Sequence, residues 1–243
     1  MAPARLSKQR LRTEALLLRL VPVGEADAMV QLFTEQAGAL SAIARGARRS
    51  SKRFSALEPM HLLRVSLDVS PVREIATLAE ASLERPRIRL TTTLRPMQSA
   101  GQALRWLRSA APARTPEPRL WDEVNALLDA LDDDASAGSE HALVAAIGLR
   151  MLVAAGWGLV LDRCVRCGKP CPSRARTIID VRAGGVVCRG CGGVGQTVRS
   201  VQRQGMIAAL AGDAAALGKA EDAELAITLV DRALEAHGRG EAT

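Results

Sequence analysis

Apolar and polar residues alternate along the first part of the chain, which is the pattern of half-buried β-strands. The alternation is clearest where Leu63, Val65, Leu67 and Val69 are separated by polar residues. Other short apolar runs are bounded by turn-forming residues, as at 35–38. Five strands are therefore predicted, at residues 16–21, 29–34, 39–44, 63–69 and 72–81. Five short strands in this part of the chain favour a small β-barrel.

After Pro86 the apolar residues recur at helical spacing instead. Prolines at positions 112, 116 and 118 mark a link between two helices, and Ser139 is the expected N-cap of a third. Helices are predicted at residues 101–107, 120–131, 142–161, 198–217 and 223–237. Strands followed by helices predict an α+β protein, with one domain at residues 1–86 and a helical domain at residues 87–243.

Residues 142–161 are long enough for a bilayer crossing and contain a single charge, Arg150. A central arginine costs about 2.5 to 3.5 kcal/mol on membrane insertion, and three glycines weaken the helix further. A buried helix within a bundle is therefore predicted for this segment, and no membrane partner is expected.

Two C-x2-C-G half-sites stand out in the second half, CVRCG at residues 164–168 and CRGCG at 188–192. Two cysteines three positions apart can chelate one ion from a tight turn, and the separation of twenty residues fits a zinc site. The segment between them has a strand pattern at 177–181, a glycine turn at 182–185 and a second strand at 186–187. This layout predicts a zinc ribbon at about residues 162–197.

The predicted ligands of a structural Zn²⁺ ion are Cys164, Cys167, Cys188 and Cys191. Four thiolates fill a tetrahedral site and leave no open position for water or substrate. The cations beside the ligands, Arg163, Arg166, Lys169 and Arg189, would offset the negative charge of the centre. The odd cysteine, Cys171, leaves three alternatives open: an iron–sulfur cluster, a regulatory thiol pair, or five thiols with no metal.

Charge is unevenly distributed along the 243 residues, whose net charge is +7. Residues 1–89 hold fifteen Lys and Arg against nine Asp and Glu, and residues 160–203 hold nine against two. The stretches 90–159 and 204–243 are acidic. Two basic zones therefore point to a polyanion, most simply nucleic acid, that part of the protein binds. An odd number of cysteines and a start without a secretory signal pattern predict the cytoplasm.

The densest basic run is ARGARRSSKRF at residues 44–54, which follows a predicted strand. Its cations, Arg45, Arg48, Arg49, Lys52 and Arg53, are the predicted DNA-binding residues because guanidinium and ammonium groups suit successive phosphates. The alternative is a solvated basic loop without a ligand. The chain has no Tyr, two Phe and three Trp, so little stacking of bases is expected. The turn residues Gly24, Glu25 and Asp27 are predicted to be structural.

No catalytic site is predicted. The three histidines are scattered along the sequence and none belongs to a metalloprotease or deaminase motif. A G-x-G-x-x-G match at residues 190–195 overlaps the second cysteine pair and lacks a βαβ frame, and residues 212–219 fail as a phosphate-binding loop.

In this combination of motifs and predicted elements, the chain resembles the bacterial RecO family of recombination mediators. The resemblance covers nearly the whole chain and is carried by VGEAD at residues 23–27 with LFT at 32–34, by ARGARR at 44–49 with Arg53 and Phe54, and by the two C-x2-C-G half-sites with Gly184 and Gly185 between them. It implies an N-terminal OB-fold barrel and a helical domain with an inserted zinc module.

The resemblance further implies a non-catalytic protein that binds single- and double-stranded DNA and anneals complementary strands. It would act with RecR to load RecA onto DNA covered by single-strand-binding protein (SSB), whose acidic C-terminal tail it would recognise, and it would be associated with the nucleoid. No local motif assigns residues to RecR or SSB.

Two other functional classes remain open from the residues alone. One is a zinc-ribbon adaptor of the transcription or translation machinery, which would bind DNA weakly and not anneal it. The other is a redox enzyme that uses Cys164, Cys167 and Cys171, which would be free of metal and would carry a reactive thiol.

Overall fold

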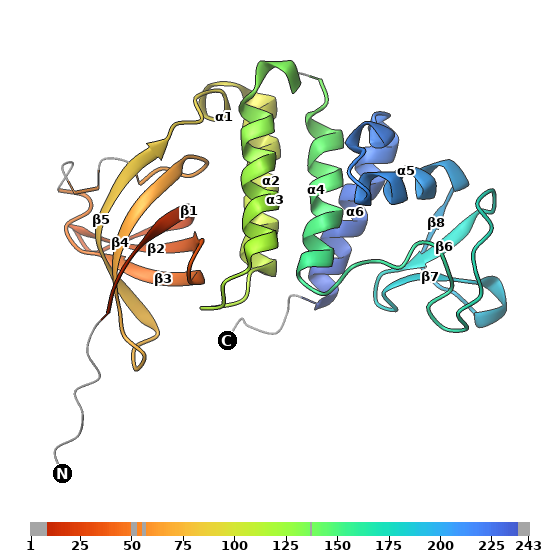
Figure 1. Ribbon diagram of the computed structural model, residues 1–243, viewed down its shortest axis with the longest axis horizontal. Coiled ribbons are helices and arrows are strands. Elements are labelled where there is room, and N and C mark those ends of the chain that lie inside the picture. The colour runs from red at the N-terminus through yellow and green to blue at the C-terminus, as the bar shows by residue number, and fades with distance from the viewer. Residues whose placement is uncertain (1–8, 50–52, 55–56, 137, 238–243) are drawn as a thin grey trace, which may run out of the picture. The chain divides into compact units, whose positions relative to one another are not determined.

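The computed structural model describes residues 9–49, 53–54, 57–136 and 138–237, whose course is shown in Figure 1. The chain divides into two compact units. The first combines Met1–Thr92 with Ala111–Trp121, and the second combines Thr93–Ala110 with Asp122–Thr243. Residues 111–121 therefore belong with the N-terminal strands, although helices flank them in the sequence.

Five strands of the first unit form a closed barrel, coloured red to gold in Figure 1. The strands are β1 (Gln9–Val23), β2 (Asp27–Thr34), β3 (Gly38–Ala44), β4 (Leu62–Val69) and β5 (Ile75–Arg85). Their order around the barrel is β1-β2-β3-β5-β4, and β4 pairs with β1 to close it. Only the pairing of β3 with β5 is parallel among these strands. This confirms the predicted OB-type barrel.

The barrel interior is filled by alternate apolar side chains such as Leu17, Val30 and Leu67, none of which is more than 1% exposed. Strict alternation would expose the next residues along, yet Leu16 and Phe33 are fully buried as well. They are cross-strand neighbours on the outer face, and the ring of Trp121 lies 5.7 Å from that of Phe33. Both faces of this part of the barrel are therefore covered.

The proline-rich link between two helices also forms hydrogen bonds with the barrel. Ala39 on β3 donates its N–H to Pro112 O at 3.3 Å, and Arg114 N donates to Ala39 O at 2.8 Å. The Arg114 guanidinium also binds the carbonyl oxygens of Ser70, Arg73 and Glu74. Because these carbonyls belong to the turn between β4 and β5, the fifth strand begins at Ile75 and not at residue 72 as predicted.

The helices are α1 (Arg89–Thr92), α2 (Leu94–Ala110), α3 (Pro118–Asp132), α4 (Glu140–Ala154), α5 (Ser200–Leu210) and α6 (Ala220–His237). Ser139 occupies the N-cap position of α4, as predicted. The prediction of one helix over residues 198–217 is wrong. Residues Gln196–Val198 form a strand, and a turn at Ala211 and Gly212 separates α5 from a short 3-10 helix at Ala214–Leu217.

Helix α4 is buried on nearly all sides, as predicted, although it ends at Ala154. Gly148 lets Trp106 of α2 approach closely, because a Cβ there would overlap the indole ring. Its one interior cation, Arg150, donates to the Glu123 carboxylate at 2.7 Å and to Ala209 O at 3.2 Å. Within the part of the chain that the structure describes, none of the helices has the length and apolar character needed to cross a membrane.

The predicted ribbon is a three-stranded antiparallel sheet in the order β7-β6-β8. Its strands are β6 (Thr177–Asp180), β7 (Gly185–Val187) and β8 (Gln196–Val198). Gly185 lies close to the backbone of Val160, and a Cβ at this position would overlap the Val160 carbonyl oxygen. Gly195 lies equally close to the Ile179 carbonyl oxygen, so it too has no room for a Cβ. The third strand was not predicted, because three residues are too few to show a period.

The turn between β2 and β3 depends on Gly38, whose φ is 64° and whose α-carbon lies against Thr115 O. We expect Gly38→Ala to lower the free energy of unfolding by about 2 to 3 kcal/mol, because it adds steric overlap to backbone strain. Gly24→Ala is the matched control, since its φ is 58° but no atom lies within 4 Å of the added carbon. It should cost about 1 kcal/mol. Urea unfolding of both variants measures the difference, and equal losses would contradict the packing described here.

Candidate metal centre and basic loop

The four cysteines of the two half-sites lie on two tight turns. In the first turn Gly168 donates its N–H to Cys164 O at 2.9 Å, and Cys164 N donates to Lys169 O at 2.9 Å. In the second, Cys191 N donates to Cys188 O at 3.0 Å. The glycine that ends each pair adopts a positive φ, 72° at Gly168 and 69° at Gly192, which an L side chain adopts with strain. The repeated C-x2-C-G spacing thus produces two tight turns, each ended by a glycine with positive φ.

These turns bring the sulfur atoms of Cys164, Cys167, Cys188 and Cys191 within 4.8 Å of one another. The Sγ atoms of Cys167 and Cys188 are 3.8 Å apart, too far for a disulfide. Sulfur atoms at the corners of a tetrahedron with Zn–S bonds of about 2.3 Å would lie about 3.8 Å apart. The donor set therefore fits a tetrahedral metal ion. Among the described residues it is the one group of at least three His, Cys, Asp or Glu side chains that could hold a metal.

Cys171, the fifth cysteine, is not part of this group. Its sulfur lies 3.9 Å from Pro172 O, and its N–H donates to Asp162 O at 2.8 Å. The geometry therefore removes the ambiguity that the sequence left about which four cysteines come together.

The thiols have very different affinities for protons. Backbone N–H groups of Cys188, Cys167 and Arg166 lower the pKa of Cys164 to about 6, with the Cys188 N–H 3.4 Å from its sulfur. Hydrogen bonds with the Cys188 and Cys167 side chains, together with burial, raise the pKa of Cys191 to about 12. The Cys164 thiolate is thus stabilised while the Cys191 thiol resists ionisation, and a cation at the centre of the group would remove that resistance.

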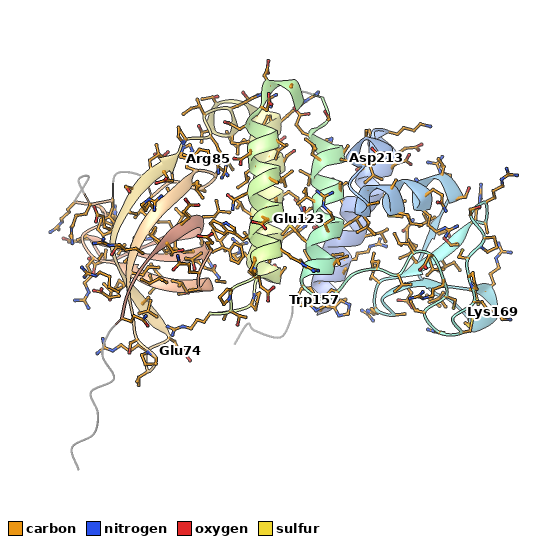
Figure 2. All side chains as sticks on the ribbon, in the orientation of Figure 1. Glu74, Arg85, Glu123, Trp157, Lys169 and Asp213 are labelled. Atoms are coloured by element: carbon orange, nitrogen blue, oxygen red, sulfur yellow. The ribbon has the colours of Figure 1, made fainter. Side chains whose placement is uncertain are left out.

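Of the four cations predicted to offset the charge of the centre, Arg166 contacts the second cysteine turn. Arg166 donates to Cys191 O at 2.7 Å and lies 3.9 Å from the Asp180 carboxylate, so it links the two turns. Arg163 lies 3.6 Å from Asp162. Lys169, labelled in Figure 2, is exposed at the outer edge of the ribbon, and Arg189 is exposed as well.

A further arginine that the sequence did not single out anchors the first cysteine turn. Arg203 of α5 is 1% exposed and donates to Leu161 O at 2.9 Å and to Pro172 O at 2.6 Å. These two carbonyls lie on either side of the first cysteine pair in the sequence. Only its place in a helix near the ribbon could have drawn attention to this residue.

The basic loop, residues 45–53, connects β3 toward β4 and contains the predicted DNA-binding residues. Arg45, Arg48, Arg49 and Arg53 are all exposed, and Lys52 lies outside the described residues. Arg53 donates to Arg45 O at 3.2 Å, and its guanidinium lies 5.2 Å from the ring centre of the buried Phe54. Four cations of the loop are thus placed on the barrel surface.

The turn VGEAD between β1 and β2 holds this loop in place. The Asp27 carboxylate accepts the N–H of Gly46 at 2.8 Å, and Ala26 O accepts the N–H of Arg48 at 3.0 Å. The Arg48 side chain also donates to Gly24 O at 3.3 Å. The structural role predicted for Asp27 is confirmed. Two sequence stretches that are about twenty residues apart therefore form one surface feature.

The Glu25 carboxylate lies 3.1 Å from Arg49, but the two side chains are 91% and 67% exposed. Exposed ion pairs of this kind contribute about 0 to 1 kcal/mol, so Arg49 remains available to another anion.

Comparison with known proteins agrees with this architecture. The family model of the recombination protein O N-terminal region matches residues 8–87, and that of its C-terminal region matches residues 97–241. A DNA repair protein RecO of Geobacter metallireducens is 32% identical over 230 residues, which cover 93% of this chain and 91% of the relative. A RecO protein of Anaeromyxobacter sp. strain K is 35% identical over 183 residues, which cover 75% of this chain and 70% of the relative. A RecO protein of Rubrobacter xylanophilus is 31% identical over 183 residues, which cover 74% of this chain and 71% of the relative. The resemblance seen in the motifs is confirmed, and the chain belongs to the RecO family of DNA repair proteins.

Proposed function

We propose that this protein is a non-enzymatic recombination mediator that binds DNA through its phosphates and anneals complementary strands. With RecR it helps to load RecA onto single-stranded DNA covered by SSB, and it recognises the acidic C-terminal tail of SSB. Membership of the RecO family supports a role in DNA repair and recombination. The DNA-binding step is supported mainly by one observation, the cluster of exposed arginines on the basic loop. The backbone of this loop is held against an OB-type barrel.

In this proposal residues 1–86 form the nucleic-acid-binding domain and residues 87–243 the helical domain. The DNA contacts are made by Arg45, Arg48, Arg49, Lys52 and Arg53. Arginine forks bind phosphate oxygens without reading bases, so the protein should accept any sequence. The proposed place of action is the cytoplasm, at the nucleoid.

The positions of the aromatic side chains explain how binding is compatible with annealing. Phe33, Phe54, Trp106 and Trp121 are buried, and Trp157 is half-buried against His237 at 5.9 Å between ring centres. No Phe or Trp is therefore exposed as a platform for bases, and all five lie within the described residues. Stacking contributes about 1 to 3 kcal/mol per base and would have to be broken before pairing. Bases bound only through their phosphates stay free to pair.

The mechanism follows from repulsion between strands. Two single strands repel each other through their phosphates, and cations that neutralise those phosphates lower the repulsion and raise the local concentration of both strands. Base pairing can then nucleate without any chemical step by the protein. This mechanism needs no catalytic residue.

A structural Zn²⁺ ion is proposed for the cysteine group, with Cys164, Cys167, Cys188 and Cys191 as ligands. When bound, the ion neutralises part of the thiolate charge and ties the two turns together. The side chains Arg166 and Arg203 hold the surrounding carbonyl groups and the first turn. A redox role is disfavoured because Cys164, whose pKa is lowered, is 2% exposed.

The zinc proposal is tested by replacing one predicted ligand and one non-ligand. Wild-type protein should contain one zinc per chain, Cys171→Ser should keep it, and Cys188→Ser should lose most of it, since three thiolates bind zinc more weakly than four. Elemental analysis measures the metal, and limited proteolysis should show new cleavage within residues 162–197 of the Cys188 variant. Equal zinc in both variants, or metal-free wild-type protein, would contradict the assignment.

The phosphate-binding proposal is tested by the salt dependence of single-strand binding. Replacing Arg48 and Arg49 by Ala should make the slope of log K against log salt shallower by about 1.4, because each phosphate contact contributes about 0.7. Fluorescence anisotropy with a labelled oligonucleotide measures the slope. The control variant, Arg10→Ala with Arg64→Ala, removes two barrel cations that are already paired with Asp68 and Glu84, and should leave the slope nearly unchanged. An unchanged slope in the loop variant would remove the basic loop from the mechanism.

A further inference from the structure

Exposed basic side chains are concentrated on the ribbon, and some of them are already engaged by acidic groups. Arg163 lies 3.6 Å from Asp162, and Arg166 binds Cys191 O and Asp180. Arg199, just after β8, contacts Glu221 at 2.8 Å and Asp222 at 3.3 Å. Arg166 and Arg199 are therefore engaged by groups of the protein itself, whereas the ion pair of Arg163 with Asp162 is exposed on both sides and weak.

Three other arginines are in a different position. Arg174 and Arg176 precede β6, and Arg182 lies in the turn that follows it. All three are exposed, and within the described residues no carboxylate lies at ion-pair distance from any of them. Unlike Lys169 and Arg189, they are also at least six residues away in the sequence from the four cysteines of the metal centre, so the metal centre does not explain them.

The backbone that carries these arginines is fixed. Asp180, the carboxylate closest in sequence to Arg182, accepts the N–H groups of Arg182 at 3.1 Å and Ala183 at 3.2 Å. The Asp180 carboxylate thus binds the backbone N–H groups of the turn. Arg176 adjoins Thr177, which pairs with Val198 of β8. The four residues of β6 span about 13 Å, so cations at its two ends can contact different phosphates of one strand.

The chemistry of this surface suits a flexible polyanion better than a protein. Protein partners bury apolar or aromatic anchors in an interface. Within residues 162–197, Val194 is the one large apolar side chain that is strongly exposed among those the structure describes. Guanidinium groups without apolar neighbours match phosphate oxygens instead.

We propose that Arg174, Arg176 and Arg182 form a second phosphate-binding surface, which binds the backbone of a second DNA strand. This inference rests on the proposed function, in which the basic loop binds the first strand. It assigns the ribbon a direct part in annealing, beyond the stabilisation of its own fold. One protein chain then carries two strands, one on each of its two units.

The number of strands bound per chain tests this proposal. Non-complementary single strands of about 12 nucleotides, a length within the site size of one OB fold, are titrated at low salt and the complexes are sized by analytical ultracentrifugation. The wild-type chain should bind two strands. Arg174→Ala with Arg176→Ala and Arg182→Ala should bind one, whereas the triple lysine variant at the same positions should bind two. A control that removes three exposed cations elsewhere, Arg105→Ala with Arg108→Ala and Lys219→Ala, should also bind two.

Zinc content shows whether the alanine variant keeps its ribbon, and it should equal that of the wild type. The proposal would be overturned if the zinc-loaded alanine variant bound two strands. It would also be overturned if the wild type bound only one strand and lost it when Arg48 and Arg49 were replaced by Ala. The latter result would leave the proposed function intact. A wild-type chain that binds no strand would overturn both. Binding of an acidic peptide but not of DNA by the ribbon would identify it as a protein-binding surface.

Discussion

Repulsion between neighbouring guanidinium groups is the constraint that the fold must meet at the basic loop and at the proposed phosphate-binding surface of the ribbon. Cations that are held close together and paired only weakly, as Arg49 is with Glu25, destabilise the fold that carries them, so their backbone must be fixed by interactions that do not neutralise them. On the barrel this is done by the Asp27 carboxylate and the Ala26 carbonyl, which bind backbone N–H groups of the basic loop. On the ribbon the same is done by the small sheet and by Asp180. In both places an acidic side chain binds backbone groups and leaves the arginine side chains exposed.

In the proposed function, this arrangement accounts for how a protein with almost no exposed aromatic side chains would act on single-stranded DNA. Affinity would then arise from charge, and the release of counterions would make it depend strongly on salt. Specificity for sequence is not needed, because the pairing of complementary bases supplies it. A protein that stacked bases on aromatic rings would hold single strands more tightly but would delay their pairing.

Much of the architecture could be predicted from the sequence, for identifiable physical reasons. The alternation at residues 63–69 shows a strand because one face is buried and the other is not, and the repeated C-x2-C-G spacing shows the two turns because each requires its glycine. The burial of Phe33 on the outer face of the barrel could not be predicted, since the ring that packs against it, Trp121, lies far away in the sequence. The same holds for Arg203, which contacts backbone carbonyls that no side-chain pattern reveals. The start of β5 was misplaced because Arg114 binds the preceding turn.

The central claim is that the protein joins complementary strands by neutralising their phosphates, and its most direct test is annealing. Two complementary oligonucleotides, each coated with the SSB of the same organism, are mixed at near-physiological salt with and without the zinc-loaded protein, and duplex formation is followed by fluorescence energy transfer. If the protein neutralises the phosphates, annealing should be faster with it, and that acceleration should be lost as salt is raised. Unchanged annealing with folded, zinc-loaded protein would rule out this mechanism and favour a zinc-ribbon adaptor.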